Sequence, residues 1–318
     1  MSRVGRLSAL RARPGVIRLH GHRGARGVMP ENTMAGFRYT LDCGVNAVEF
    51  DVQFARDAVP VVTHNPHLMP DMTRDAAGQW LDSQTAPINS MSLVQIQSYD
   101  MGGLQEGTAY GALYPDQAFL TGQQVPTLVQ LAELMARPEH ADVWMNLEIK
   151  SNPLHPEYSP PIPALVLSVL EVVQAHGLLG RCIIQSFDWR ILREVAVQAP
   201  NSVRSYLSDL PATATPADEN IYDGSPWMDG YVLADFDGSL PRLIAAAGGH
   251  VWSPYFADLT KADLKEARDL GLIVNVWTVN ATQDMDAMIA LGVDGIITDY
   301  PGRAQRRLLA HGMHWRDS

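Results

Sequence analysis

The most informative polar residues of this chain stand where apolar segments end. The run HGHRGARGVMPENT, at residues 20–33, closes an apolar segment and sets His22 and Arg23 between glycines. An imidazole, a guanidinium and free backbone N–H groups at one point suit an anionic, phosphate-like ligand. The run is also compatible with a surface turn before a helix, because the sequence PENT at 30–33 favours a helix N-terminus.

Acidic residues stand near the ends of two further apolar segments. Glu49 and Asp51 are two positions apart on an expected strand, so their side chains share one face. Glu148 ends a second expected strand, in the sequence MNLEIK. Three converging carboxylates without sulfur ligands or a histidine cluster indicate one hard divalent cation, Mg²⁺ or Ca²⁺. The alternative is that each carboxylate forms a salt bridge. Lys150, on the same face as Glu148, either pairs with it or binds a phosphate oxygen.

Two histidines are candidates for proton transfer. His22 and His64 are predicted to lie on opposite sides of the cation, where one accepts a proton from an attacking hydroxyl and the other donates one to a leaving oxygen. A single histidine at a strand end is more often structural, but two beside three carboxylates and a lysine favour acid–base catalysis. The strand ends also carry Phe187, Trp277 and Asp299.

The elements that must position these residues follow one repeating pattern: a helical segment, a glycine, then an apolar strand. Thr127 with Gln130, and Thr282, are expected to cap the N-termini of helices, and glycine after a helix is typical of a C-terminal cap. Repeated alternation of this kind predicts a parallel sheet covered on both faces. With this many units we expect a closed (β/α)8 barrel, the TIM-barrel fold. The candidate strands are 16–22, 45–52, 142–149, 181–186, 202–207, 249–254, 272–279 and 293–298. Segment 229–234 is a spare candidate, which leaves the sixth strand open.

Two segments depart from this alternation of helix and strand. Too few residues separate 45–52 from 59–64 for a crossover helix, so 45–64 is predicted to be a hairpin that returns His64 to Asp51. Residues 65–125 have little periodicity and are predicted to form an insertion on the C-terminal rim of a single catalytic domain spanning 1–318. The aromatic residues of this insertion could line an acyl groove, but they more often form the small core of such a segment.

Composition limits the partners and the location. A net charge of -11 argues against nucleic acid as the main partner. The two cysteines, Cys43 and Cys182, are expected to be free thiols. No signal peptide or transmembrane run is recognisable, which predicts a cytoplasmic protein without stable membrane association.

The chain resembles the glycerophosphodiester phosphodiesterase family, within the superfamily of phospholipase C-like phosphodiesterase barrels. The matching motifs, in family order, are HRG at 22–24, PENT at 30–33, VEFDV at 48–52, PVVTH at 60–64, VPTL at 125–128, LEIK at 147–150, QSF at 185–187, VWTV at 276–279 and DGIITDYP at 294–301. By this resemblance, Glu49, Asp51 and Glu148 would bind the metal, and His22 and His64 would be the catalytic pair. Arg23 and Lys150 would hold the phosphate, and Phe187 and Trp277 would line the glycerol or leaving-group side.

The resemblance implies metal-dependent hydrolysis of a small glycerophosphodiester to glycerol 3-phosphate and an alcohol. One departure is Asn65, where the family usually has aspartate, and another is the turn at 56–58, where Arg-Asp-Ala replaces the usual Lys-Asp-Gly. Three alternatives remain: a phospholipase D-like enzyme acting on lysolipids, a phosphoinositide-cleaving lyase, and a non-catalytic phosphoester-binding protein. The released alcohol, the choice of metal, the base and acid among the two histidines, and the oligomeric state are open at this point.

Overall fold

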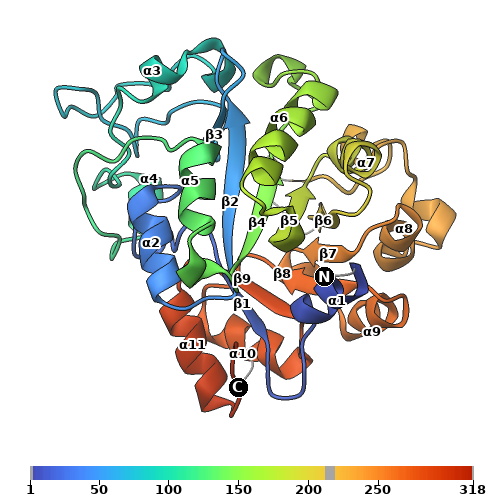
Figure 1. Cartoon of the computed structure of the whole chain (residues 1–318). Coiled ribbons are helices and arrows are strands. Elements are labelled where there is room, and N and C mark those ends of the chain that lie inside the picture. The colour runs from blue at the N-terminus through green and yellow to red at the C-terminus, as the bar shows by residue number, and fades with distance from the viewer. Residues whose placement is uncertain (1–2, 212–218, 317–318) are drawn as a thin grey trace.

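Eight parallel strands close into a barrel surrounded by helices (Figure 1), which confirms the predicted fold. The computed structural model describes residues 3–211 and 219–316, so the first and last residues of the expected 1–318 domain lie outside it. The barrel strands are β1 (Arg18–Gly21), β2 (Ala47–Phe54), β4 (Trp144–Ile149), β5 (Cys182–Ser186), β6 (Val203–Ser208), β7 (Val251–Pro254), β8 (Ile273–Val276) and β9 (Gly295–Thr298). Pairing of β1 with both β9 and β2 closes the circle. Each of these strands falls on a predicted segment.

Helices between the strands cover the outside of the barrel. They are α2 (Met34–Asp42), α5 (Leu128–Met135), α6 (Ile162–Ala175), α7 (Trp189–Gln198), α8 (Leu240–Ala246), α9 (Lys261–Asp269), α10 (Thr282–Leu291) and α11 (Pro301–Ala310). Thr127 and Gln130 cap α5 reciprocally, as their spacing indicates. Thr282 is the first residue of α10 rather than its cap, because the cap position is held by Ala281.

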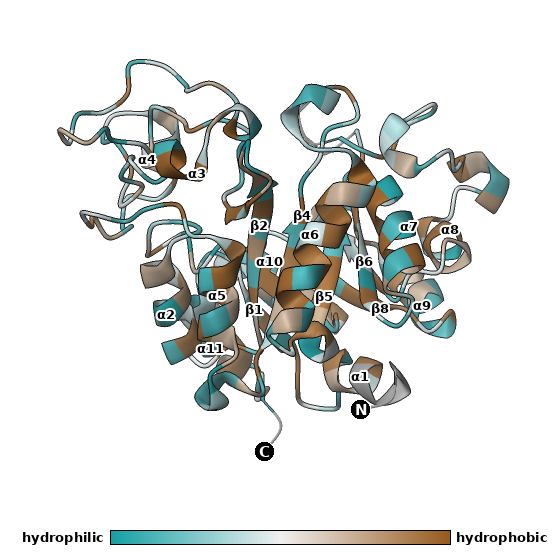
Figure 2. Ribbon diagram, turned by 45° about the horizontal axis from the view of Figure 1, so that its top comes forward, coloured by the Kyte–Doolittle hydropathy of each residue, from teal (hydrophilic) through white to brown (hydrophobic). Residues whose placement is uncertain are grey.

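The core lies between the strands and these helices, and helix α1 (Arg3–Leu10) covers part of the N-terminal end of the barrel. Figure 2 shows that hydrophobic residues make up most of the strands and much of α6. Leu10 of α1 packs in one cluster with Ile183 and Val251. A cavity of about 690 Å³ remains at this end, lined by Arg18, Trp144 and Arg181, whereas the predicted site residues stand at the C-terminal ends of the strands, where ligands of this fold bind.

The predicted hairpin is present at the edge of the barrel. Strand β3 (Pro60–Val62) pairs antiparallel with the end of β2, and Ala58 makes the turn with a left-handed φ of 60°. The Thr63 N–H donates to the Asp51 carbonyl at 3.0 Å. The return strand therefore delivers His64 to the same rim as Asp51.

The insertion has a hydrophobic core of its own. Helices α3 (Leu93–Ile96) and α4 (Ala109–Leu113) and their loops lie beside β3 at the upper left of Figure 1. Its buried side chains form one cluster: Leu68, Met72, Ile88, Met91, Ile96, Met101 and Val125, joined by Ala55 and Val61 of the hairpin. Arg74 lies between the rings of Trp80 and Phe119, 5.4 and 4.3 Å from their centroids. These contacts favour a packed insertion over an acyl groove.

Two further expectations need correction. The spare segment 229–234 forms no strand. It connects two 3-10 helices, Pro226–Met228 and Leu233–Phe236, and β6 pairs directly with β7. By length and composition, Pro156–Ala175 could cross a membrane, contrary to the expectation from sequence. In this structure α6 is a barrel helix, with Leu165, Val169 and Val173 in the core.

Candidate active site

Three carboxylates converge at the C-terminal end of the barrel. Glu49 and Asp51 project from β2, and the parallel register sets Asp51 opposite Glu148 of β4. One oxygen from each of the three lies within 4.8 Å of the others, and all three residues are buried. Three buried oxygen donors at this spacing fit a hard divalent cation. The structure thus brings together the three residues predicted as metal ligands.

The electrostatics of this trio differ from residue to residue. Burial raises the pKa of Glu49 well above its ordinary value, and the charges of Asp51 and Glu148 raise it further. Burial raises the pKa of Glu148 to about 7, against the effect of Lys150. Burial would raise the pKa of Asp51 too, but Lys150 and Arg23 hold it well below its ordinary value. The raised pKa values of Glu49 and Glu148 show that the neighbouring side chains do not stabilise three negative charges here, so a bound cation would favour the ionised form of the trio.

Arg23 and Lys150 flank the trio and are both predicted phosphate ligands. Lys150 Nζ lies 2.7 Å from Glu148 and 3.1 Å from Asp51. Arg23 Nε lies 3.3 Å from Asp51, and its Nη1 lies 3.1 Å from Glu31. Arg23 has a left-handed φ of 49°, which turns its backbone N–H toward Glu49 at 3.2 Å. Non-glycine residues adopt this conformation rarely, and where they do it is often at functional sites.

His22 is held by a carboxylate that sequence reasoning placed at a strand end without giving it a role. Its Nδ1 lies 2.7 Å from Asp299 Oδ1, and its Nε2 lies 3.7 Å from Glu49. Because an ionised carboxylate only accepts hydrogen bonds, Nδ1 carries the proton and the Nε2 lone pair is free. Burial lowers the pKa of His22 to about 4, although Asp299 acts in the opposite direction. His22 is therefore a neutral imidazole at pH 7.

His64 is oriented by an amide instead. Its Nδ1 lies 2.9 Å from Asn65 Oδ1, so the atypical Asn65 still fixes the ring but adds no negative charge. Burial lowers the pKa of His64 well below its ordinary value, and Arg23 and Lys150 add to that effect. The two imidazoles thus differ in the charge of the group behind them.

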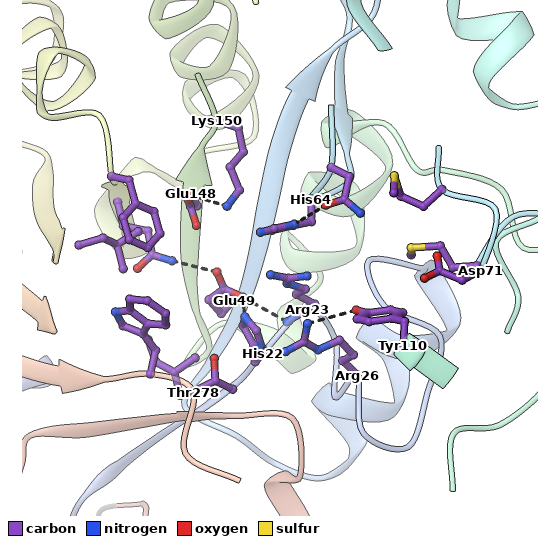
Figure 3. Close-up of a pocket in the computed structure, with 18 residues that line it drawn as sticks. His22, Arg23, Arg26, Glu49, His64, Asp71, Tyr110, Glu148, Lys150 and Thr278 are labelled. Atoms are coloured by element: carbon purple, nitrogen blue, oxygen red, sulfur yellow. Dashed lines mark hydrogen bonds and ion pairs between the residues drawn. The ribbon is translucent and has the colours of Figure 1, made fainter. Parts of the chain in front are cut away.

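These residues line a cavity of about 430 Å³ (Figure 3). Eight of the nine predicted site residues face it, and Asp51 lies beneath, where Asn32 donates to it at 2.9 Å. Phe187 and Trp277 form one wall, with ring centroids 5.3 Å apart. The insertion supplies another wall, made by Met69, Asp71, Met72 and Tyr110.

Supporting residues around the cavity escaped prediction. Gln185 Nε2 donates to Glu49 at 2.9 Å, and Glu31 accepts hydrogen bonds from Arg23 and from the Tyr110 hydroxyl. Arg26 donates to both oxygens of Asp299 at 3.0 Å. Gln185 and Glu31 belong to the QSF and PENT motifs, which gave a signal for them. Tyr110 lies in the aperiodic insertion, where no motif or periodicity marks it.

Comparisons with known proteins identify the family of this chain. The family model for the glycerophosphoryl diester phosphodiesterase family matches residues 22–303. The chain is 26% identical to a glycerophosphodiester phosphodiesterase of Caldanaerobacter subterraneus subsp. tengcongensis, over 88% of this chain and 93% of that one. A crystal structure from Silicibacter pomeroyi DSS-3, described as a candidate glycerophosphoryl diester phosphodiesterase, is 44% identical over 98% of this chain and 99% of that one, with a TM-score of 0.86.

The fold is also shared with more distant structures. An Oleispira antarctica phosphodiesterase, solved in complex with the product sn-glycerol-3-phosphate, has a TM-score of 0.64 at 20% identity and covers 92% of this chain and 97% of that one. The family model spans almost all of the barrel, from His22 at the end of β1 to α11. On this match, the chain belongs to the glycerophosphoryl diester phosphodiesterase family.

Proposed function

We propose that this protein hydrolyses water-soluble glycerophosphodiesters to glycerol 3-phosphate and an alcohol, with one divalent cation and two histidines. The observation that carries the proposal is the cavity itself, where two oriented imidazoles and two cationic side chains surround three buried carboxylates. The family membership supports the reaction class. The glycerol 3-phosphate bound to the Oleispira antarctica phosphodiesterase supports the product.

Glu49, Asp51 and Glu148 would hold the cation, Mg²⁺ or Ca²⁺. When bound, the cation offsets negative charge on the phosphate and lowers the pKa of a coordinated hydroxyl. Among the three proposed ligands, Glu49 depends most on the cation for charge balance. No lysine or arginine side chain pairs with Glu49 among the described residues. Its neighbours Asp51 and Glu148 both pair with Lys150.

The chain's own residues perform binding and proton transfer. Arg23 and Lys150 hold the non-bridging phosphate oxygens and stabilise the charge that develops on them. We assign His22 as the base, because Asp299 stabilises the imidazolium that forms when Nε2 takes the proton of the glycerol 2-hydroxyl. The alkoxide attacks phosphorus, and His64 protonates the departing alcohol. For this step His64 takes up a proton on Nε2 when the bound phosphate offsets the charges of Arg23 and Lys150, which lower the pKa of His64 in the free protein. Water then opens the cyclic phosphate to give glycerol 3-phosphate.

The first test is turnover by the whole chain after removal of metals with a chelator. Glycerophosphocholine is supplied with and without Mg²⁺ or Ca²⁺, and release of glycerol 3-phosphate is measured. We expect release only with added metal. Substrate and metal binding without release would favour the phosphoester-binding protein, and preferential cleavage of micellar lysolipids would favour the lysolipid enzyme.

The intramolecular route has a separate test. A 2-deoxy analogue lacks the attacking hydroxyl and should not be cleaved, while a single turnover of the normal diester should release cyclic phosphate transiently. Full activity on the analogue, with no cyclic phosphate detected, would show direct attack by water instead.

The organisation of the chain completes the proposal. We propose one catalytic domain over 1–318, with 65–125 as a subdomain on its rim. A cytoplasmic location stays a prediction from the sequence. Limited proteolysis that released 65–125 as a stable fragment, leaving a folded barrel, would contradict the single-domain proposal.

A further inference from the structure

The insertion places one carboxylate in the cavity that the mechanism does not use. Asp71 follows the hairpin on the chain and lines the cavity together with Met69 and Met72 of the insertion (Figure 3). The other two carboxylates that line this cavity have side-chain partners, Gln185 for Glu49 and Lys150 for Glu148. Among the described residues, no lysine, arginine, histidine or amide side chain pairs with the carboxylate of Asp71.

An unpaired carboxylate of this kind is costly for the free protein. Asp71 is half-buried, and burial raises its pKa. A hydrogen bond from its own backbone N–H acts in the opposite direction, and the nearby charge of Glu31 raises the pKa further. The arginine side chains of the cavity already form ion pairs with other carboxylates. Arg23 pairs with Glu31 and Asp51, and Arg26 pairs with Asp299. A half-buried charge is best stabilised by a partner of opposite sign, and here the ligand is the remaining source of one.

The surroundings of Asp71 narrow the chemistry of that ligand. Met69 and Met72 present thioethers, which are polarisable and donate no hydrogen bonds. Tyr110 presents its ring, since its hydroxyl donates to Glu31. Thioethers and an aromatic ring accommodate methyl groups, and a ring face and a carboxylate both attract a cation. Together they suit a quaternary ammonium better than a primary amine, because among these residues only Asp71 would accept from the three N–H groups of a primary ammonium.

We propose that Asp71 selects glycerophosphodiesters whose released alcohol carries a quaternary ammonium group, as choline does. This inference rests on the proposed function. Figure 3 shows Arg23 between Glu148 and Asp71. The Phe187–Trp277 wall is on the Glu148 side, since Lys150 Nζ, which pairs with Glu148, lies 5.8 Å from the centroid of the Phe187 ring. A phosphate held by Arg23 and Lys150 then directs its glycerol to the aromatic wall and its alcohol to Asp71. Diesters with an anionic head group are disfavoured by the same carboxylate.

A second cavity offers a competing route for the head group. It has a volume of about 180 Å³, shares His64 and Lys150 with the first, and is lined by Tyr158 and Trp227. Its only carboxylate among the described residues is Glu148, which pairs with Lys150. Its aromatic rings would also attract a cation, so the two routes are separated by the variants Asp71→Asn and Trp227→Ala and not by charge preference alone.

The test compares two esters of the same shape, glycerophosphocholine and the 3,3-dimethylbutyl ester, in which carbon replaces the ammonium nitrogen. We expect the wild-type protein to prefer choline, and Asp71→Asn to lower the choline-to-dimethylbutyl ratio of kcat/KM by about five- to tenfold, mainly through KM. Inhibition by free choline should weaken to a similar extent. Glu106→Gln is the matched control, because it removes the same charge from an exposed part of the insertion.

Three results would overturn the inference. An unchanged ratio in Asp71→Asn would exclude the carboxylate as the selector. A ratio that falls in Trp227→Ala but not in Asp71→Asn would place the head group in the second cavity. An equal fall of the choline-to-dimethylbutyl ratio in Glu106→Gln would mean that the overall charge of the protein, and not Asp71, causes the preference. A wild-type protein that cleaves neither ester with metal present would instead refute the proposed function itself.

Discussion

The contact between Asp299 and His22 leads to the sharpest prediction. Asp299→Asn keeps the shape of the side chain but replaces an acceptor-only carboxylate by an amide that can donate. An amide N–H facing Nδ1 favours the tautomer with its proton on Nε2, where the proposed base needs a lone pair. The carboxylate that stabilises the forming imidazolium is lost at the same time.

The magnitude follows from two contributions. Loss of the charge-assisted hydrogen bond, 2.7 Å long, costs about 1.5–3 kcal/mol in the transition state. Loss of a correctly positioned general base costs about 10²- to 10⁴-fold in rate. We therefore expect kcat to fall by about 10²- to 10⁴-fold. The variant also leaves the buried Arg26 without its counter-charge, which should lower the free energy of unfolding by about 3 kcal/mol.

A double-mutant cycle distinguishes a catalytic effect from a structural one. Glycerol 3-phosphate release is measured for the wild-type protein, for Asp299→Asn, for His22→Ala and for the double variant, with unfolding followed by urea titration. If Asp299 acts through His22, the substitution should change kcat little once His22 is absent. An equal loss of kcat in both backgrounds, or a single variant within threefold of wild type, would refute the reasoning.

Three further predictions concern the metal site and the thiols. Glu49→Gln should weaken metal binding, seen as a smaller rise in Tm on adding Mg²⁺ and a higher metal concentration for half-maximal activity. An unchanged metal titration would contradict the assignment. In metal-free protein, Glu148 has a folded-state pKa of about 7 against 4.5 in model peptides. The folded state therefore binds more protons between these values, and its contribution to the free energy of unfolding should decrease from pH 4.5 to 7. Comparison with Glu148→Gln, which should lack this slope, isolates the contribution. Burial raises the pKa of Cys182 to about 12, so at pH 8 a thiol reagent should label at most Cys43 in the native protein and both cysteines in urea. Two labelled thiols in native protein would contradict that burial.

The barrel was predictable because its signals are local. Apolar runs, glycine caps and cap residues such as Thr127 act within a few positions, and each of the eight strands fell on its expected segment. The metal trio followed from the same information, since alternation on β2 and the parallel register with β4 bring Asp51 and Glu148 together. Errors arose where local signals compete, as at Thr282, a good cap residue that lies one position inside its helix.

The support around the site depends on long-range closure and was therefore hidden. Asp299 and His22 are 277 positions apart and meet because β9 pairs with β1, a contact that exists only once the barrel is complete. No spacing within either segment indicates the pair. The roles of Asp71 and Tyr110 depend on how an aperiodic insertion folds over the rim, which hydrophobic periodicity does not specify.

The insertion contributes to the geometry of the catalytic residues as well as covering them. Tyr110 donates to Glu31 and accepts from Arg26 at 3.2 Å. Glu31 in turn pairs with Arg23, and Arg26 pairs with Asp299, the partner of His22. One hydroxyl of the insertion thus contacts both networks that orient the proposed phosphate-binding arginine, Arg23, and the proposed base, His22. Substitutions in the insertion that move Tyr110 should therefore change kcat as well as KM, because the same contacts set the geometry of both side chains.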